Sequence, residues 1–216
     1  MKKSTNNMKY KIVNIYENIK EARQGITVDD LYFYAISDRH VGKYERKSGK
    51  KVLSRKYDDN IKHLNGGFID GDNLVCTHNP KGINSIVTIN KHNLEIINRY
   101  DLTNTKLTNN INSTFIDGTN SYLTWISRYN SKTYGVIAFY KEHVDNTIFC
   151  EFDEKFNIIN SWKFPKKVLS RLKPWSVSGG FVKNGYIYAS GHDKGEIYIL
   201  HIKDDKNILE LLEIID

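Results

Sequence analysis

The chain has 216 residues, a formal net charge of +7, a hydrophobic content of 39% and an aromatic content of 12%, with 14 tyrosines and only three prolines. This length allows one domain with a substantial core, or at most two small ones. The abundance of Tyr, Ile, Val and Phe in short stretches argues against a helical protein and favours half-buried strands.

Charge and hydropathy exclude several partners. No block of Lys and Arg is long enough to form a nucleic-acid-binding arm, so a nucleic-acid partner is not expected, whereas the positive charge attracts small anions. No apolar run approaches the length of a membrane span, so no membrane partner is expected. The first residues, MKKSTNNMKYKIVN, lack the apolar segment of a secretory signal, and we therefore expect a cytoplasmic protein.

The N-terminal region divides into two parts. Residues 1–7 are polar without periodicity and are predicted to form a disordered tail, so that the domain spans residues 8–216. Residues 10–16, YKIVNIY, alternate between apolar and polar as a strand does. Because propellers often pair a terminal strand with the last blade, which removes an open sheet edge, we expect this strand to close the ring.

Four stretches then repeat one pattern, in which a small or polar pair precedes a short apolar strand, a turn of Asp, Asn or Gly, and a second strand. Such self-similarity, with two further strands after each stretch, is typical of propeller blades. At roughly 45 residues per blade, the sequence predicts an all-β propeller of four to five blades. The stretches are QGITVDDLYFYAIS from Gln24, GGFIDGDNLVCTHN from Gly66, STFIDGTNSYLTWIS from Ser113 and GGFVKNGYIYASGH from Gly179.

The third repeat is followed by extra residues. The run YGVIAFY at 134–140 fits either a projecting hairpin or a strand of a fifth, irregular blade. In residues 166–174, KKVLSRLKP, the apolar residues have helical spacing, which predicts a short helix that Pro174 ends. Cys76 and Cys150 fall in predicted strands without a CxxC partner, which indicates buried free thiols.

The polar residues of the repeats fall in loops that share one face of a propeller, around the mouth of the central channel. Trp175 offers a flat surface for stacking, and the histidines offer hydrogen bonds. For His78 and for the pair of His192 and Asp193, structural hydrogen bonds at turns are the alternative. The predicted ligand-binding residues are Gln24, His63, Asn65, His78, Trp175, Ser178, His192, Asp193 and Glu196.

Known catalytic and cofactor motifs are missing from the sequence. It has no nucleophile elbow, P-loop, dinucleotide fingerprint or zinc-finger spacing, and no HxH or HExxH pair. No metal site is therefore predicted, the catalytic residues and the cofactor are unknown, and whether the protein is an enzyme stays open.

Three segments carry a resemblance to a known family. They are EARQGITVDDLYFYAISDRHVGKYERKSGK, HLNGGFIDGDNLVCTHN and WKFPKKVLSRLKPWSVSGGFVKNGYIYASGHDKGEIYIL. They resemble a family of small bacterial propeller proteins with lactonase-like repeats that are loosely labelled cycloisomerase-like. The resemblance covers the chain from about residue 18; it implies a propeller fold and, through the label, larger lactonising enzymes.

Three functions follow from these observations. The first is a ligand-binding propeller whose pocket at the channel mouth takes a small anionic or sugar-like molecule. The second is a metal-assisted lactonase or cycloisomerase that uses the His, Asp and Glu residues. The third is a protein-interaction scaffold, with residues 128–146 as the contact surface for a protein partner.

Overall fold

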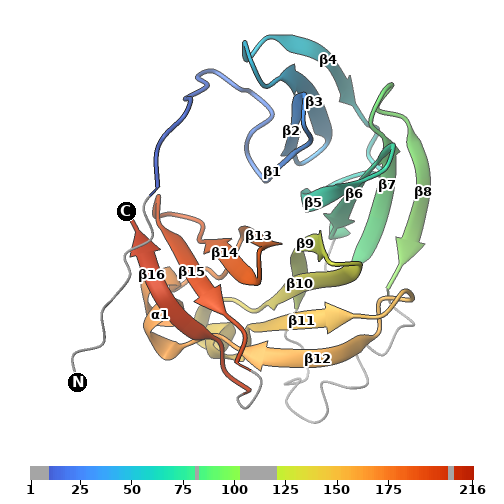
Figure 1. Ribbon diagram of the computed structural model, residues 1–216. Helices are drawn as coiled ribbons and strands as arrows, with labels where there is room; N and C mark the ends of the chain where they lie inside the picture. Colours follow the sequence, from blue (N-terminus) through green and yellow to red (C-terminus); the bar gives the residue numbers. More distant parts are fainter. Residues whose placement is uncertain (1–9, 81–82, 103–120, 204–206) are drawn as a thin grey trace.

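The computed structural model describes residues 10–80, 83–102, 121–203 and 207–216, and it is an all-β, four-bladed propeller with four antiparallel strands in each blade (Figure 1). Each blade is built from one continuous segment whose strands run in order from the channel to the outside. The prediction of a propeller is confirmed, and the number of blades is four rather than five.

The blades follow one another around the channel in the order of the sequence. Blade 1 contains β1 (Gly25–Val28), β2 (Tyr32–Ser37), β3 (His40–Glu45) and β4 (Lys51–Lys56). Blade 2 contains β5 (Leu64–Asp70), β6 (Asn73–His78), β7 (Ser85–Asn90) and β8 (Ile96–Asp101). Blade 3 contains β9 (Tyr122–Tyr129), β10 (Lys132–Ala138), β11 (Ile148–Phe152) and β12 (Ile158–Lys163). Blade 4 contains β13 (Gly179–Lys183), β14 (Tyr186–Ser190), β15 (Ile197–His201) and β16 (Glu210–Ile215).

The core lies between neighbouring blades. The middle strands are buried along most of their length, whereas the outer strands β4 and β8 are mainly exposed. Apolar clusters fill the spaces between blades 1 and 2, blades 2 and 3, and blades 3 and 4. The inner strands contact each other in the order β1, β5, β9 and β13, which holds their first residues around one end of the channel.

Blade 3 differs from the sequence prediction. Its inner strand is β9, which joins β10 through Asn130 and Ser131, with φ of 49° and 63°. Two consecutive residues with positive φ form the tight turn that matches the twist of a hairpin. The run YGVIAFY therefore supplies β10, so neither the projecting hairpin nor the fifth blade is present. The inner hairpin expected around Asp117 and Gly118 lies outside the described residues.

The N-terminal segment does not close the ring, so that prediction was wrong. Residues 10–16 form no strand, and β16 pairs only with β15 among the described strands. From residue 10 the described part of the segment instead leads across to β1 (Figure 1). Tyr16 and Ile19 pack against a small cluster on blade 1, and the Tyr16 hydroxyl donates to the carbonyl of Arg46. Side-chain packing on blade 1 thus replaces backbone pairing with blade 4. The predicted tail of residues 1–7 lies outside the described residues.

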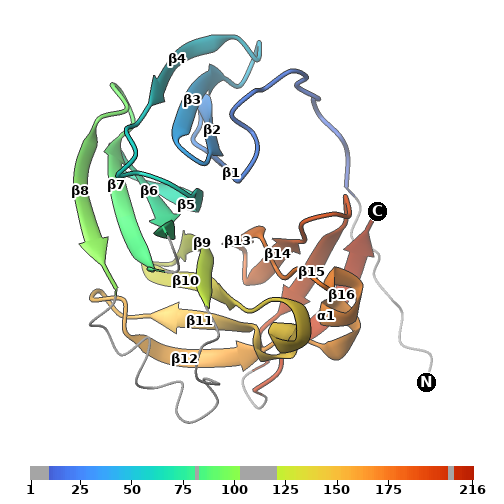
Figure 2. The same cartoon turned by 180° about the vertical axis from the view of Figure 1, so that it is seen from behind.

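Two short helices lie between blades 3 and 4. The predicted helix is confirmed as α1 (Lys166–Leu172), which buries Val168, Leu169 and Leu172 in the core cluster of these blades. The 3-10 helix η2 (Lys141–Asn146) follows β10 and contacts α1 (Figure 2). Among the described residues, no helix is long and apolar enough to cross a membrane.

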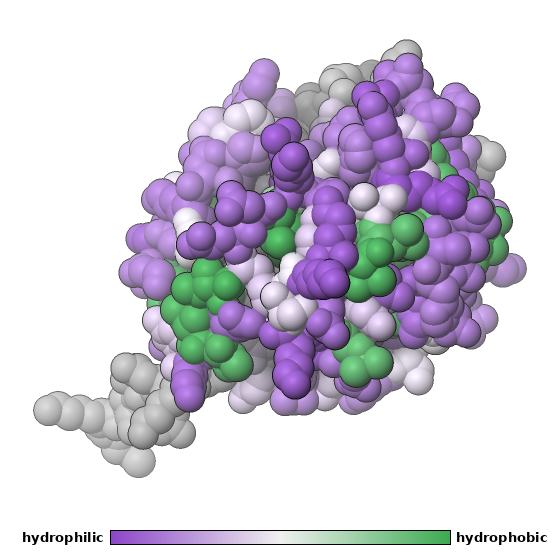
Figure 3. Space-filling view, turned by 90° about the horizontal axis from the view of Figure 1, so that it is seen from above, coloured by the Kyte–Doolittle hydropathy of each residue, from purple (hydrophilic) through white to green (hydrophobic). Residues whose placement is uncertain are grey.

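Cys76 and Cys150 are buried and free, as predicted. Seen from above the view of Figure 1, the surface is mostly hydrophilic and its apolar residues form separate small patches (Figure 3).

Candidate functional site

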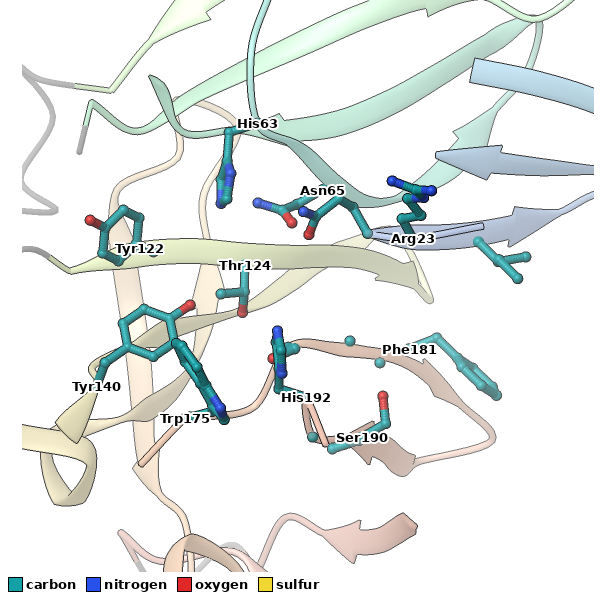
Figure 4. A pocket seen from close by; sticks show the side chains of 18 of the residues that line it. Arg23, His63, Asn65, Tyr122, Thr124, Tyr140, Trp175, Phe181, Ser190 and His192 are labelled. Carbon is teal, nitrogen blue, oxygen red and sulfur yellow. The ribbon is translucent and has the colours of Figure 1, made fainter. Parts of the chain in front are cut away.

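A pocket of about 1210 Å³ lies at the end of the channel where the inner strands begin (Figure 4). All four blades contribute to it, because the first residues of β1, β5, β9 and β13 meet there. The pocket also reaches η2 and the loop after β14. Its polar and aromatic lining residues are Arg23, Gln24, His63, Asn65, Tyr122, Thr124, Tyr140, Lys141, Glu142, His143, Trp175, Ser178, Phe181, Tyr188, Ser190 and His192.

One wall is a continuous row of rings from blades 3 and 4. Tyr122 and Tyr140 meet edge to face at a centroid distance of 5.4 Å, and Tyr140 meets Trp175 at 6.3 Å. Trp175 then stacks on His192 at 4.6 Å, with an interplanar angle of 27°. Burial raises the pKa of Tyr140 to about 12, so its hydroxyl stays protonated and can donate a hydrogen bond.

Two residues that line the pocket have an uncommon backbone conformation. His63 and Lys141 have φ of 62° and 57°, a region that side chains other than glycine rarely occupy. The His63 N–H donates to Oδ1 of Asp38 at 2.8 Å, and the Lys141 N–H donates to the carbonyl of Pro174 at 2.7 Å. Such conformations persist only where the surroundings hold them, and they concentrate at functional sites.

A row of side-chain amides fixes the orientation of Asn65. The Leu123 N–H donates to Oδ1 of Asn84, which sets the Asn84 amide. Nδ2 of Asn79 donates to the same oxygen at 2.6 Å, and Nδ2 of Asn65 then donates to Oδ1 of Asn79 at 2.9 Å. Nδ2 of Asn84 donates to the carbonyl of Ser121 at 3.1 Å, which agrees with this assignment. Asn65 therefore presents its Oδ1 and one remaining N–H at the pocket wall.

The charged groups of the lining are mainly cationic. Neither the Arg23 guanidinium nor the Lys141 ammonium has an ion-pair partner among the residues that the structure describes. Glu142, the carboxylate of the lining, lies 3.4 Å from Nε2 of His143. This balance of charge favours an anion in the pocket.

The structure brings together most, but not all, of the predicted site residues. Six of the nine line the pocket: Gln24, His63, Asn65, Trp175, Ser178 and His192. Asp193 does not line it, but its carboxylate pairs with Nδ1 of His192 and thereby orients the ring that stacks on Trp175. The binding role of these residues stays a prediction.

His78 does not reach the pocket, because its ring is completely buried below the surface. Its Nδ1 lies 2.7 Å from the Ser85 hydroxyl, and its Nε2 accepts from the Lys62 N–H at 3.2 Å. Burial lowers the pKa of the His78 imidazole to about 4, so the ring is neutral at pH 7. These contacts correspond to the structural alternative.

Glu196 also lies outside the pocket lining. Its carboxylate accepts from Nε of Arg171 at 3.0 Å, and it forms further hydrogen bonds with Nη2 of Arg171 and the hydroxyl of Tyr198. The hydrogen bonds from Arg171 and Tyr198 lower the pKa of Glu196 to about 2. Glu196 therefore connects α1 to blade 4 rather than facing the channel.

Sequence reasoning missed most of the other lining residues, among them Arg23, Tyr122, Thr124, Tyr140 and Lys141. Tyr122, Tyr140 and Thr124 lie in or next to strands, where tyrosine and threonine are common core or surface residues. Arg23 directly precedes the predicted Gln24, but a single arginine in a basic chain gives no signal of its own. Arg23 lies two residues before β1, and this position next to the predicted Gln24 was the signal available for it.

The described part of the chain contains no set of side chains that could ligate a metal ion. Among residues 10–80, 83–102, 121–203 and 207–216, no group of three or more His, Cys, Asp or Glu side chains is arranged to hold a metal ion.

Comparisons with known proteins agree on the fold. The sequence matches no family model and no curated protein. The structure is similar to Myxococcus xanthus glutaminyl cyclase, with a TM-score of 0.58 and 15% identity over 91% of this chain and 71% of that chain. It is also similar to the hemopexin fold protein CP4 from cow pea, with a TM-score of 0.53 and 10% identity over 90% of this chain and 92% of that chain. A third similar structure is the Malassezia sympodialis allergen Mala s 1, with a TM-score of 0.50 and 10% identity over 88% of this chain and 62% of that chain.

These identities are low enough that the likenesses show the fold alone. The protein is thus a small β-propeller with a pocket at one end of its channel, and the cycloisomerase-like family suggested by the sequence stays a prediction.

Proposed function

We propose that this propeller binds a small anionic molecule that carries hydroxyl groups, such as a sugar acid, in the pocket at the channel mouth. The observation that carries the proposal is the combination of two cations, Arg23 and Lys141, with a wall of aromatic rings around one cavity. Arginine and lysine recognise carboxylates, and ring faces and edges pack against the apolar faces of sugar rings.

Hydrogen-bonding groups support the sugar-like part of the ligand. Asn65 presents an acceptor and a donor in a fixed orientation, and the Tyr140 hydroxyl stays protonated because burial raises its pKa to about 12. Ser178 and Thr124 add hydroxyls to the lining. Hydroxyl-bearing ligands need both donors and acceptors, which these groups supply.

Binding is favoured over the enzyme alternative by the chemistry of the described residues. A metal-assisted lactonase needs a ligand set, and the described residues contain no group of three or more suitable side chains. Of the two carboxylates that the sequence placed in the site, Glu196 is held by Arg171 and Tyr198, and Asp193 pairs with His192. The proposal therefore assigns no reaction to the pocket.

Calorimetric titration with D-glucuronate, D-glucose and acetate tests the proposal. We expect glucuronate to bind most tightly, and its affinity to fall with added salt because a charge contributes. Arg23→Ala removes a charge-assisted hydrogen bond at an exposed position and is expected to weaken glucuronate binding about tenfold. Trp175→Ala is expected to weaken it roughly three- to tenfold.

Arg55→Ala is the matched control, because Arg55 pairs with Glu95 on the outer surface and does not line the pocket. Equal binding of glucose and glucuronate would contradict the anionic part of the proposal, and equal binding of acetate and glucuronate would contradict the hydroxyl part.

A further inference from the structure

The pocket has a second end whose chemistry differs from that of the ring wall. Ile26 on β1, Phe181 on β13 and Ile197 on β15 all line the pocket, and they are 57%, 50% and 41% exposed. In Figure 4, Phe181 lies at the opposite end of the pocket from Tyr140 and Trp175. Three large apolar side chains at one end of a binding cavity are a surface that an apolar group of a ligand would cover.

This apolar end lies between blade 4 and blade 1. The inner strands contact one another in the order β1, β5, β9 and β13. The first and the last of these strands, β1 and β13, both line the pocket. The other three pairs of adjacent blades fill the space between them with buried apolar clusters. At this junction the N-terminal segment packs on blade 1, and residues of β13, β14 and β15 of blade 4 line the cavity.

The lining of this apolar end includes a flat surface. Phe181 stacks on Tyr188 at a centroid distance of 4.8 Å and an interplanar angle of 9°. Gly179 and Gly180 also line the cavity here and present no side chain to narrow it. A stacked aromatic pair beside glycine backbone suits an extended hydrocarbon chain better than a polar group, which would lose its hydrogen bonds to water.

Charge lies directly beside the apolar end. Arg23 precedes Ile26 on the same segment of blade 1, so a carboxylate bound by Arg23 would have the apolar opening next to it. The cavity of about 1210 Å³ also exceeds the usual range of roughly 300–1,000 Å³ for small-molecule pockets, and a single sugar acid would not fill it.

We infer that the ligand is amphipathic, with an anionic, hydroxyl-bearing head in the channel mouth and an apolar tail in the opening between blades 1 and 4. The position of the head rests on the proposed function. The position of the tail rests on Ile26, Phe181 and Ile197.

Titration with a series of ligands tests this inference; they share one sugar-acid head and differ in the length of the alkyl tail. The probes are D-glucuronate and its butyl and octyl β-D-glucuronides, used below the concentration at which they form micelles, together with octanoate, which has the apolar tail and a carboxylate but no sugar. We expect affinity to rise about twofold for each of the first methylenes, roughly half of what complete burial would give, because the opening is half exposed.

Two variants locate the tail. Phe181→Ser and, separately, Ile197→Ser are expected to reduce the gain from glucuronate to the octyl compound to about threefold, and thermal melting shows whether each variant is folded. Ile97→Ser is the control, because Ile97 on β8 is 57% exposed and does not line the pocket. This variant is expected to keep the full gain.

The outcomes separate the two proposals. Binding of glucuronate with an affinity that does not change with tail length, or a gain that survives both variants, would overturn the apolar tail and leave the proposed function standing. Binding of octanoate and the octyl compound that depends on Phe181, without binding of glucuronate, would support the tail site and contradict the sugar-acid head. If no member of the series binds, both proposals fail.

Discussion

Gly180→Ala tests the packing of the channel most sharply. Gly180 lies on the inner strand β13, next to the indole of Trp125 from blade 3. A Cβ at this position would lie 2.5 Å from the carbonyl oxygen of Tyr188 and 2.7 Å from Cζ2 of Trp125. Trp125 cannot move aside at low cost, because it is completely buried and its ring lies 6.0 Å from that of Phe149. The neighbouring backbone must shift instead, since both contacts fall well short of van der Waals distance.

Overpacking of a filled core typically costs about 1–3 kcal/mol, and we place Gly180→Ala in the upper half of that range because a strand carbonyl is one of the two obstacles. For a chain of this size, about 2–3 kcal/mol lowers the melting temperature by roughly 4–12 °C. Thermal melting followed by circular dichroism measures the change. Gly195→Ala is the matched control, because its Cβ would meet nothing within 4 Å. A melting temperature of Gly180→Ala equal to that of this control would refute the packing of β13 against Trp125.

Three further predictions concern residues that hold the site in place. The folded-state pKa of His78, about 4, lies below the ordinary value of 6.5, so the unfolded chain binds more protons between these values and stability falls as the pH falls from 6.5 to 4. His78→Gln should remove up to about 3 kcal/mol of this pH dependence in urea unfolding, and an unchanged pH profile would contradict it. Glu196→Gln should lower the melting temperature, because the carboxylate that pairs with Arg171 loses its charge, and should leave the affinity for glucuronate unchanged. A lower affinity would contradict the placement of Glu196 outside the pocket. Tyr16→Ala should lower the free energy of unfolding by about 1–2 kcal/mol, because packing on Phe33 is lost. Tyr10 is 61% exposed, so Tyr10→Ala should not change the free energy of unfolding measurably. Equal melting temperatures of the two variants would contradict the packing role of the N-terminal segment.

The blades could be predicted because their signals are local. Short alternating strands joined by Asp, Asn and Gly turns determine each hairpin, and α1 was predictable because Val168, Leu169 and Leu172 have helical spacing. The inner hairpin of blade 3 was placed too early because FIDG at 115–118 repeats the FIDG of blade 2. The turn that joins β9 to β10 consists of Asn130 and Ser131 and lacks the glycine that marks such turns most clearly.

The site could be predicted only in part, since a loop position does not reveal where a side chain points. His63 directly precedes β5 and His78 is the last residue of β6, yet the His78 ring turns inward to Ser85. The closing strand was expected because YKIVNIY alternates, but alternation does not identify what a segment packs against. Tyr122 and Tyr140 come together because β9 pairs with β10 and places the start of one strand beside the end of the other, and the sequence pattern had not identified this pairing.

The most direct test of the binding site is fluorine NMR of protein labelled with 5-fluorotryptophan, because the chain has three tryptophans and only Trp175 lines the described pocket. Trp125 and Trp162 belong to or pack against the core of blades 3 and 4 and serve as internal controls. Titration with glucuronate and octyl glucuronide should shift the Trp175 resonance, assigned with Trp175→Phe, and leave the other two in place. A bound ligand that leaves the Trp175 resonance unmoved would contradict a site at the channel mouth.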